Sequence, residues 1–403
     1  MSNNKSAGFF DSALLSLDVG VWNKMKILFI NLPYQGHVIP TIGLVKELMK
    51  QGCCVTYLLP FEWKKMLDGT GVEFVGYPNH KKLSEQIKNA YAAAEQFVQG
   101  YDLVIYEQFF FLGKHLAEKY NKPAVRIFTA PVTNEKLMQE YINAGGALGL
   151  FRYRWIGKNW TKSVAKGISL KTDCWLDEIV QNPPDLNLVY TLDEYQPYRE
   201  EFEDEKYKFL GASIFDREHE KFEISKKGLP VIYISLGTVI KGATIFFKRC
   251  VQAFEKEDVT VILSVGKQFD IRKLGKIPGN FHVYQTVPQL SVLKQADVFV
   301  THGGMNSVSE ALVCGVPMVV IPFMADQPTN ARRIEELGLG KRLDYKEVSS
   351  ELLKQTVLEL LTDKELQERV AGMKEKMENC PGNQGGVKYI LDYYETDCQS
   401  REK

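Results

Sequence analysis

Residues 300–312 read VTHGGMNSVSEAL, and they give the strongest indication of architecture in the chain. An apolar strand leads into two glycines, and the residues after the glycines open a helix. In such a turn, several backbone N–H groups and the positive end of the helix point into one place, which makes an anion cradle. His302 can donate to a phosphate oxygen, and Glu310 suits paired hydroxyls such as those of a ribose. A plain connection with glycine turn residues is the alternative interpretation.

The surrounding sequence repeats this strand, loop and helix pattern. Apolar strands are expected within residues 230–238, 259–266, 281–288, 296–304 and 317–323, with helix-length segments between them. Residues 26–128 show the same alternation, beginning with a nearly continuous apolar run at 26–32, as expected for a central parallel strand. The sequence therefore predicts an α/β protein with two doubly wound halves.

Four regions follow from this alternation. Residues 1–24 are expected to be an N-terminal extension before Met25, or a short docking helix. Residues 25–210 form the predicted first domain and residues 228–375 the second, with a charged linker at 200–227. Residues 376–403 are periodic and charged, which predicts surface helices that return to the first domain.

Composition excludes several functional classes. The 403 residues contain 50 Lys plus Arg and 50 Asp plus Glu, so no net field draws the protein onto nucleic acid. The 7 Cys include no C-x-x-C pair, which fits reduced thiols in a cytoplasmic protein better than disulfides or structural zinc. No apolar run approaches the ~20 residues of a membrane-spanning helix, so no integral membrane segment is expected.

Two further turns in the second half carry polar side chains. The SLGT turn places Ser235 and Thr238 at the end of a buried strand, as a second phosphate-friendly nest. Ligands of open α/β sheets bind at the carboxyl ends of strands, so two nests on one edge imply a diphosphate. Asp326 and Gln327 follow another strand and suit sugar hydroxyls. A solvated loop with Asp326 as a helix cap is equally compatible with the local sequence.

The first half offers a candidate general base. The loop PYQGHVIP, residues 33–40, places His37 after a strand and before a helix. Glu107 ends another strand of the same predicted sheet. A carboxylate that accepts from one imidazole nitrogen fixes the tautomer, and the other nitrogen can then take a proton. A histidine that caps the helix or packs in the loop is the alternative.

The motifs GHVIP, SLGT, VPQL, THGGMNSVSEAL and DQPTNA occur in an order and at spacings that resemble the family 1 UDP-sugar-dependent glycosyltransferases. The bacterial macrolide glycosyltransferase group is the nearest match, from about Met25 to Gly385 and Gly386. The resemblance implies a GT-B fold, in which two Rossmann-like domains face each other across a cleft. It also implies inverting transfer from a UDP-sugar, expected to be UDP-glucose, without metal or cofactor. The absence of an Asp-x-Asp triplet at a predicted strand end agrees with this.

By position, the resemblance implies that His37 is the base and Glu107 its partner. Glu310 would bind the ribose, and Asp326 and Gln327 the sugar. The implied donor-binding residues are Ser235, Thr238, Thr286, Val287, Gln289, His302, Gly304, Met305, Asn306, Ser307, Glu310, Asp326 and Gln327. Two positions depart from the family pattern: Thr286 replaces an aromatic residue that stacks on uracil, and Glu107 replaces Asp.

The acceptor is less well defined by the sequence. Aromatic residues at 106–111 and 141–160 either line an apolar pocket or belong to the core. A pocket would predict a small hydrophobic or phenolic acceptor. Alternative functions are a UDP-sugar epimerase, a non-catalytic UDP-sugar-binding protein and a lipid glycosyltransferase at the membrane surface. Basic residues that would serve the last function are Arg152, Arg154, Lys158, Lys162 and Lys166.

Overall fold

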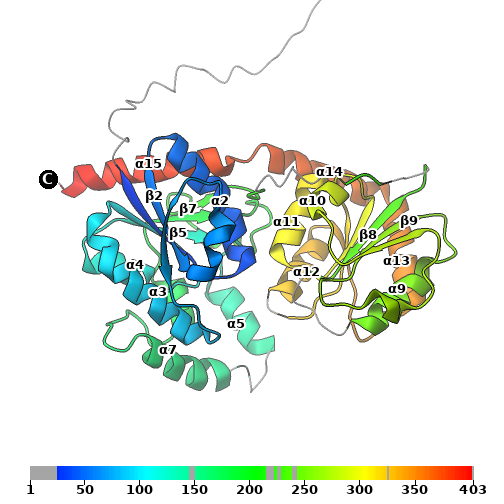
Figure 1. The fold of residues 1–403 in the computed structure, drawn as a ribbon, viewed down its shortest axis with the longest axis horizontal. Helices are drawn as coiled ribbons and strands as arrows, with labels where there is room; N and C mark the ends of the chain where they lie inside the picture. The colour runs from blue at the N-terminus through cyan, green and yellow to red at the C-terminus, as the bar shows by residue number, and fades with distance from the viewer. Residues whose placement is uncertain are drawn as a thin grey trace, which may run out of the picture.

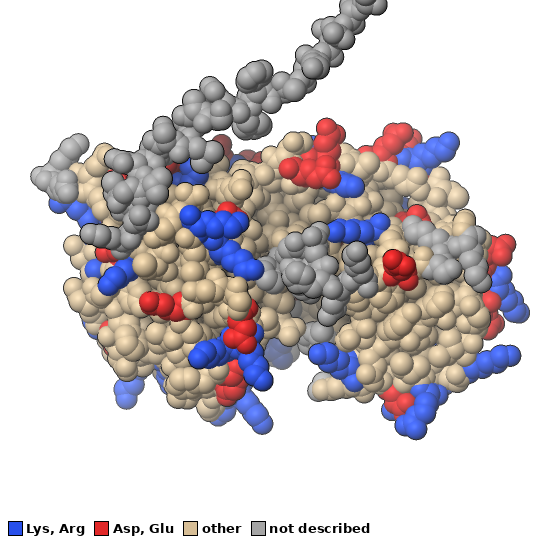
Figure 2. Space-filling view, turned by 45° about the horizontal axis from the view of Figure 1, so that its top comes forward, with Lys and Arg blue, Asp and Glu red and all other residues tan. Residues whose placement is uncertain are grey.

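The computed structural model describes residues 25–144, 149, 151–214, 222–224, 228–237, 243–324 and 326–401. The predicted extension 1–24 lies outside these residues. Two α/β domains lie side by side, each built on one parallel sheet with helices on both faces (Figure 1). On the face shown in Figure 2, Lys and Arg side chains are interspersed with Asp and Glu over both domains. The predicted α/β class with two doubly wound halves is confirmed.

The first sheet has the strand order β3-β2-β1-β4-β5-β6-β7. The order reverses between β1 and β4, where Phe29 pairs with Tyr57 on one side and Ile105 on the other. Ligands bind at such a reversal, beyond the carboxyl ends of the strands. The strands are β1 Lys26–Ile30, β2 Cys54–Pro60, β3 Glu73–Tyr77, β4 Leu103–Glu107, β5 Ala124–Phe128, β6 Leu186–Val189 and β7 Tyr207–Phe209.

Two apolar cores cover the faces of this sheet. One core joins the sheet to α2 Gln35–Lys50 and to the C-terminal helix α15 Gly382–Arg401. The other joins it to α3 Leu83–Phe97 and α4 Gly113–Lys119. The remaining elements of this domain are short: η2 Phe61–Leu67, η3 Val98–Gly100, α5 Glu135–Ala144, η4 Arg152–Gly157, α7 Lys158–Val164, α8 Trp175–Gln181 and η5 Arg199–Glu201.

The second sheet has the order β10-β9-β8-β11-β12-β13 and reverses between β8 and β11. Ser235 and Thr301 pair across that reversal, which brings the SLGT and THGG turns together. Below them, the rings of Tyr233 and Phe299 stack at 4.7 Å. The strands are β8 Val231–Ser235, β9 Thr260–Ser264, β10 Phe281–Tyr284, β11 Val298–Thr301, β12 Met318–Val320 and β13 Gly340–Arg342.

The helices of the second domain pack on both faces of this sheet around a single core. They are α9 Thr244–Phe254, η6 Ile271–Leu274, α10 Gln289–Leu293, α11 Met305–Cys314, α12 Gln327–Glu336, α13 Ser350–Thr362 and α14 Lys364–Glu378. No helix within the described ranges is long and apolar enough to cross a membrane.

The domains are linked by chain crossings and by side chains. The backbone N–H of Gly382 donates to Leu210 O at 3.0 Å, where the returning chain meets the outgoing one. Beyond it, Val387 and Ile390 of α15 enter the core of the first domain. On the cleft side, Arg332 of α12 pairs with Glu140 of α5 at 2.7 Å.

Part of the expected linker is folded. Residues 207–209 form strand β7, in which Phe209 pairs with Val189 of β6, although the charged composition of 200–227 suggested a connection. This edge strand has three half-buried residues, and the charged residues before it belong to the turn that precedes the strand. Strands β6 and β13 were not predicted either. Two of the three residues of β13 are the exposed Lys341 and Arg342, and β6 is a run of only four residues that includes the polar Asn187.

Candidate active site

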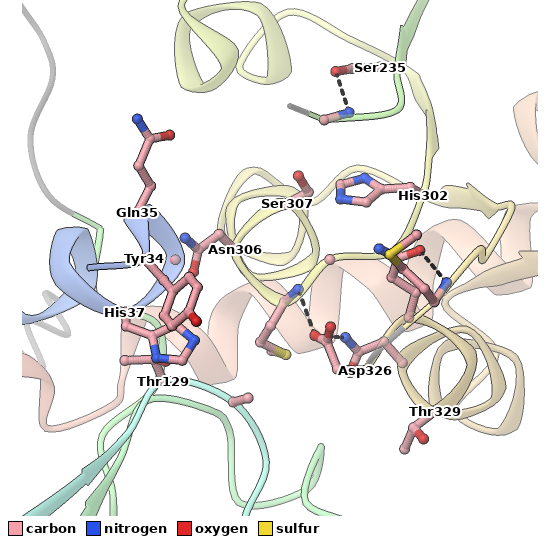
Figure 3. Close-up of a pocket in the computed structure, with 18 of the residues that line it drawn as sticks. Tyr34, Gln35, His37, Thr129, Ser235, His302, Asn306, Ser307, Asp326 and Thr329 are labelled. Carbon is pink, nitrogen blue, oxygen red and sulfur yellow. Dashed lines mark hydrogen bonds between the residues drawn. The ribbon is translucent and has the colours of Figure 1, made fainter. Parts of the chain in front are cut away.

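A cleft of about 1710 Å³ lies between the domains, and both domains line it. Single small-molecule sites are usually ~300–1000 Å³, so this cleft has room for two ligands together. His37 and Tyr34 approach it from the first domain, and His302 and Ser307 from the second (Figure 3). The carboxyl ends of both sheets therefore face one shared space.

His37 and Glu107 form a hydrogen-bonded pair on the first-domain side. His37 Nδ1 lies 2.9 Å from Glu107 Oε2, and the Glu107 side chain is 1% exposed, against 18% for His37. A carboxylate only accepts, so Nδ1 carries the proton and Nε2 of the neutral ring is an acceptor. The rings of Tyr34 and Phe109 flank the imidazole, each at 5.2 Å.

The local position of His37 differs from the prediction. Helix α2 begins at Gln35, so His37 lies on its first turn and not in a loop. Gly36 and Pro40 suggested a loop because both are poor helix residues, but Pro40 is buried inside α2. The amide of Asn31, at the end of β1, donates to the backbone carbonyl of His37 at 3.1 Å.

Asn31 belongs to a buried polar network that sequence reasoning missed. Its amide also donates to the hydroxyl of Tyr57 at 2.9 Å, and that hydroxyl lies 2.6 Å from Thr41 Oγ1. Asn31 and Thr41 are fully buried. An asparagine that ends an apolar strand is the only local signal of this network. The network fixes the backbone of the first α2 turn to β1 and β2.

On the second-domain side, two glycines surround the ring of His302. Gly237 has a φ of +72°, and a Cβ there would lie 2.7 Å from His302 Cε1. A Cβ at Gly304 would lie 2.6 Å from His302 Nε2. Burial lowers the pKa of His302 to about 4, so the ring is neutral near pH 7. Gly304 is also the N-cap residue of α11, whose first N–H groups face the cleft region.

Glu310 is held by its neighbours. Gln289 Nε2 donates to Glu310 Oε2 at 2.8 Å and to Ser307 Oγ at 3.2 Å. Gln289 Oε1 accepts from the buried hydroxyl of Tyr233 at 3.2 Å. This chain of hydrogen bonds fixes the carboxylate of Glu310 at the cleft wall, as a site for hydroxyl donors would require.

Asp326 and Gln327 both line the cleft and also brace its backbone. Asp326 Oδ2 accepts from the N–H of Met305 at 3.3 Å and from Asn330 Nδ2 at 2.9 Å. Asp326 therefore caps α11 across space, and its side chain makes no cap hydrogen bond to its own helix α12. Burial raises the pKa of Asp326. Gln327 Oε1 accepts from the N–H groups of Phe323 and Met324, at 2.8 and 3.1 Å. These two hydrogen bonds fix the side-chain amide against the backbone of the preceding turn.

The structure brings the predicted donor residues together, with one exception. Thr238 lies outside the described residues. The others line the cleft: Ser235, Thr286, Val287, Gln289, His302, Gly304, Met305, Asn306, Ser307, Glu310, Asp326 and Gln327. Sequence reasoning missed Phe247, Lys267, Phe269 and Lys273, which line the same wall. Among the described residues, no cluster of three or more His, Cys, Asp or Glu could hold a metal ion.

The aromatic stretches divide between core and cleft. Tyr106, Phe110 and Phe111 are buried in the core, whereas Phe109 lines the cleft. Of the stretch 141–160, the side chains of 141, 144–148 and 150 lie outside the described set. Residues Arg152, Tyr153, Ile156, Gly157 and Trp160 line the cleft, next to Met138, Ile142 and Trp175. The cleft wall of the first domain is thus mainly apolar and aromatic.

Two parallel-sheet domains with a shared cleft define the GT-B class, and solved structures agree. The glycosyltransferase of kitacinnamycin superimposes with a TM-score of 0.81 and 27% identity, over 92% of this chain and 99% of that one. The GT-B prediction is confirmed. The family described as UDP-glucoronosyl and UDP-glucosyl transferase matches residues 212–377.

Curated relatives extend this similarity to the whole chain. The NDP-glycosyltransferase YjiC of Bacillus subtilis is 34% identical over 89% of this chain and 95% of its own length. The oleandomycin glycosyltransferase of Streptomyces antibioticus is 26% identical over 94% of this chain and 92% of its own. The chain belongs to the UDP-glycosyltransferase family, and it is a glycosyltransferase, as the sequence motifs predicted.

Proposed function

We propose that the protein transfers a sugar, expected to be glucose, from a UDP-sugar to a hydroxyl of a small lipophilic or aromatic acceptor. The transfer inverts the anomeric centre and needs no metal. One observation carries this proposal: the His37–Glu107 pair opens onto the same cleft as the glycine-flanked N-terminus of α11. A base and an anion cradle on opposite walls are the two elements that such a transfer requires.

The geometry supports a single displacement. Glu107 holds the proton of His37 on Nδ1, so Nε2 takes the proton of the acceptor hydroxyl. The hydroxyl oxygen forms a bond to the anomeric carbon while the bond from that carbon to the UDP oxygen breaks. The leaving electron pair adds charge to the diphosphate. Attack opposite to the leaving group gives inversion.

The second domain supplies charge stabilisation for this step. The N–H of Met305 is bonded to Asp326, so the N–H groups that follow it in the first turn of α11 and the positive end of the helix dipole favour a diphosphate. Neutral His302 donates a hydrogen bond to it. We assign Glu310 to the ribose hydroxyls, and Asp326 and Gln327 to the sugar hydroxyls. Thr286 and Val287 lie on the wall proposed for uracil.

The acceptor assignment rests on the wall of the first domain. Its side chains beyond His37 are mainly apolar, among them Phe109, Met138, Trp160 and Trp175. Such walls favour an acceptor with a large apolar surface and few polar groups. Two similar proteins are named as the oleandomycin glycosyltransferase and the glycosyltransferase of kitacinnamycin. These names point to natural products of this kind as acceptors.

The test is a transfer assay with a panel of UDP-sugars and mixed phenol and macrolide acceptors, in the presence of EDTA. UDP release and a gain in acceptor mass are expected. In His37→Ala the transfer rate should fall by ~10²- to 10⁴-fold, the usual contribution of a general base, while UDP binding persists. His282→Ala, at an exposed position of β10, is the matched control and should keep full activity.

Each other outcome has a defined meaning. Near-full turnover of His37→Ala would overturn the assignment of the base. UDP release without a glycosylated product would indicate hydrolysis, and conversion of one UDP-sugar into another would indicate an epimerase. Tight UDP binding without any reaction would favour a binding protein.

A further inference from the structure

The rim of the cleft carries a helical segment whose outer face has no role in the proposed reaction. The π-helical turn η4 continues directly into α7, at the bottom of the first domain in Figure 1. Its inner side packs on the domain, where Thr161 and Val164 are buried. One edge of the segment, with Tyr153, Ile156 and Trp160, lines the cleft. The remaining face points to solvent.

That outer face exposes large apolar side chains within little more than one turn. Phe151 is 50% exposed, Trp155 64% and Ile156 47%. The rings of Phe151 and Trp155 stack on each other at 5.6 Å with an interplanar angle of 18°. Exposed apolar side chains scattered singly are ordinary, but a contiguous group indicates a surface that binds something.

The same segment has a strong excess of positive charge. Residues 151–172 contain no Asp or Glu, and their basic residues are Arg152, Arg154, Lys158, Lys162, Lys166 and Lys171. Lys158 pairs with Asp173 at 3.3 Å. No ion pair within the described part of the chain involves Arg154, Lys162 or Lys166, which are all exposed. In a chain with a net charge of zero, this basic stretch is a local feature.

We propose that residues 151–166 form a docking surface for an anionic lipid bilayer. Helices that lie in a membrane interface combine aromatic side chains, which enter the headgroup region, with Lys and Arg, which contact anionic headgroups. Phe151, Trp155 and Ile156 supply the first component, and Arg154, Lys162 and Lys166 the second. Charge complementarity selects this occupant, because each such cation contributes about 1 kcal/mol near an anionic membrane surface.

Docking through this face would place the cleft at the membrane. Ile156 is both exposed and part of the cleft wall, so the docking surface and the wall of the acceptor site are continuous. Under the proposed function, an apolar acceptor dissolved in the bilayer would then enter the cleft without crossing bulk water. The docking itself does not depend on that function.

The test is flotation of the full-length protein with vesicles of phosphatidylcholine, with and without phosphatidylglycerol. We expect binding to the anionic vesicles only, and weaker binding at high salt because exposed charges are screened. The variant Lys162→Glu/Lys166→Glu should lower the partition coefficient by at least about tenfold. Phe151→Ser/Trp155→Ser should also release the protein.

Matched controls keep the result specific. Lys346→Glu/Lys364→Glu makes the same charge change at exposed positions of the second domain. Phe61→Ser removes a ring that is 60% exposed elsewhere on the first domain. Both controls should bind like the parent protein. The proposal is overturned if the protein does not bind anionic vesicles, or if the controls lose binding equally. It is also overturned if Lys162→Glu/Lys166→Glu and Phe151→Ser/Trp155→Ser still float with the vesicles. Binding to a single-stranded oligonucleotide but not to vesicles would also overturn it.

A separate readout tests the proposed function. All four variants should transfer sugar to a water-soluble phenol at the parental rate, since none of these side chains lines the cleft. Loss of flotation with intact transfer isolates the docking surface. Flotation without any transfer activity would leave docking intact and count against the proposed function.

Discussion

The buried amide of Asn31 donates to the backbone carbonyl of His37 at 3.1 Å, so this hydrogen bond fixes the main chain of the proposed base. The same amide donates to Tyr57, and the tyrosine hydroxyl lies within hydrogen-bond distance of Thr41. Three elements, β1, β2 and α2, therefore share one polar network below the cleft. We therefore expect the position of the imidazole to depend on Asn31, Thr41 and Tyr57, none of which lines the cleft.

Tyr57→Phe should lower the free energy of unfolding by about 1–3 kcal/mol, because it leaves the amide of Asn31 without one buried acceptor. The transfer rate should fall as well, since the first α2 turn loses a contact. Urea denaturation measures the first effect. Tyr91→Phe is the control: the Tyr91 hydroxyl is buried without a hydrogen-bond partner, so its removal should not destabilise the protein. Equal losses in both variants would contradict the role of the network.

Glu107→Gln should reduce kcat by about a hundredfold or more, because an amide does not stabilise the imidazolium as a carboxylate does. Folding stability should not fall, since the change removes a buried charge. Glu107→Asp should also lose activity, because the shorter side chain withdraws the oxygen that lies 2.9 Å from His37 Nδ1. Glu118→Gln, at an exposed position of α4, should be neutral in the same kinetic assay. An active Glu107→Gln enzyme would exclude the pair from the mechanism.

Gly304→Ala should weaken UDP binding, because the added Cβ would lie 2.6 Å from His302 Nε2 and displace the ring. The backbone of Gly304 has a φ of −64°, which alanine adopts without strain. A change in UDP affinity would therefore come from the contact between the new Cβ and His302. Isothermal titration with UDP measures the change. Gly372→Ala, in α14, meets nothing within 4 Å and should stabilise the protein slightly. Unchanged UDP affinity in Gly304→Ala would show that the ring position is irrelevant to the diphosphate.

Stability should fall as the pH drops from about 6.5 towards 4, the interval between the ordinary pKa of histidine and that of buried His302. In that interval the unfolded chain binds a proton at His302 that the folded chain does not. The contribution is at most about 1.4 kcal/mol per pH unit. His302→Gln should show a shallower fall in urea denaturation across this range. Parallel pH curves for the two proteins would contradict a buried neutral histidine.

The sequence was most informative where strands are fully buried. Strand β8 and strand β11 were predictable because every residue in them is buried, which produces an unbroken apolar run. The short edge strands β7 and β13 carry no such run. The start of α2 was predicted too late, because Gly36 and Pro40 are poor helix residues and burial of α2 in the core of the first domain outweighs their propensity.

The candidate site shows the same division. Motifs placed His302 and Asp326 at strand ends and Glu310 on the helix after the glycine pair, and the structure brings all three to one cleft with His37. Their roles, the inverting mechanism, the sugar and a cytoplasmic location remain predictions. Tyr57 and Phe269 could not be found from local patterns, because they reach the site region from strands or loops distant in sequence. The hydrogen bond that Asp326 accepts from the N–H of Met305 is likewise a tertiary contact.

The return of α15 to the first domain affects how the protein can be rebuilt. Val387 and Ile390 complete the core that covers α2, so the first domain is made of two separate pieces of sequence. A gene fragment that ends at residue 210 would leave that core open to water. A chimaera that exchanges the first domain between relatives therefore has to carry the 20 residues of α15 together with the N-terminal half.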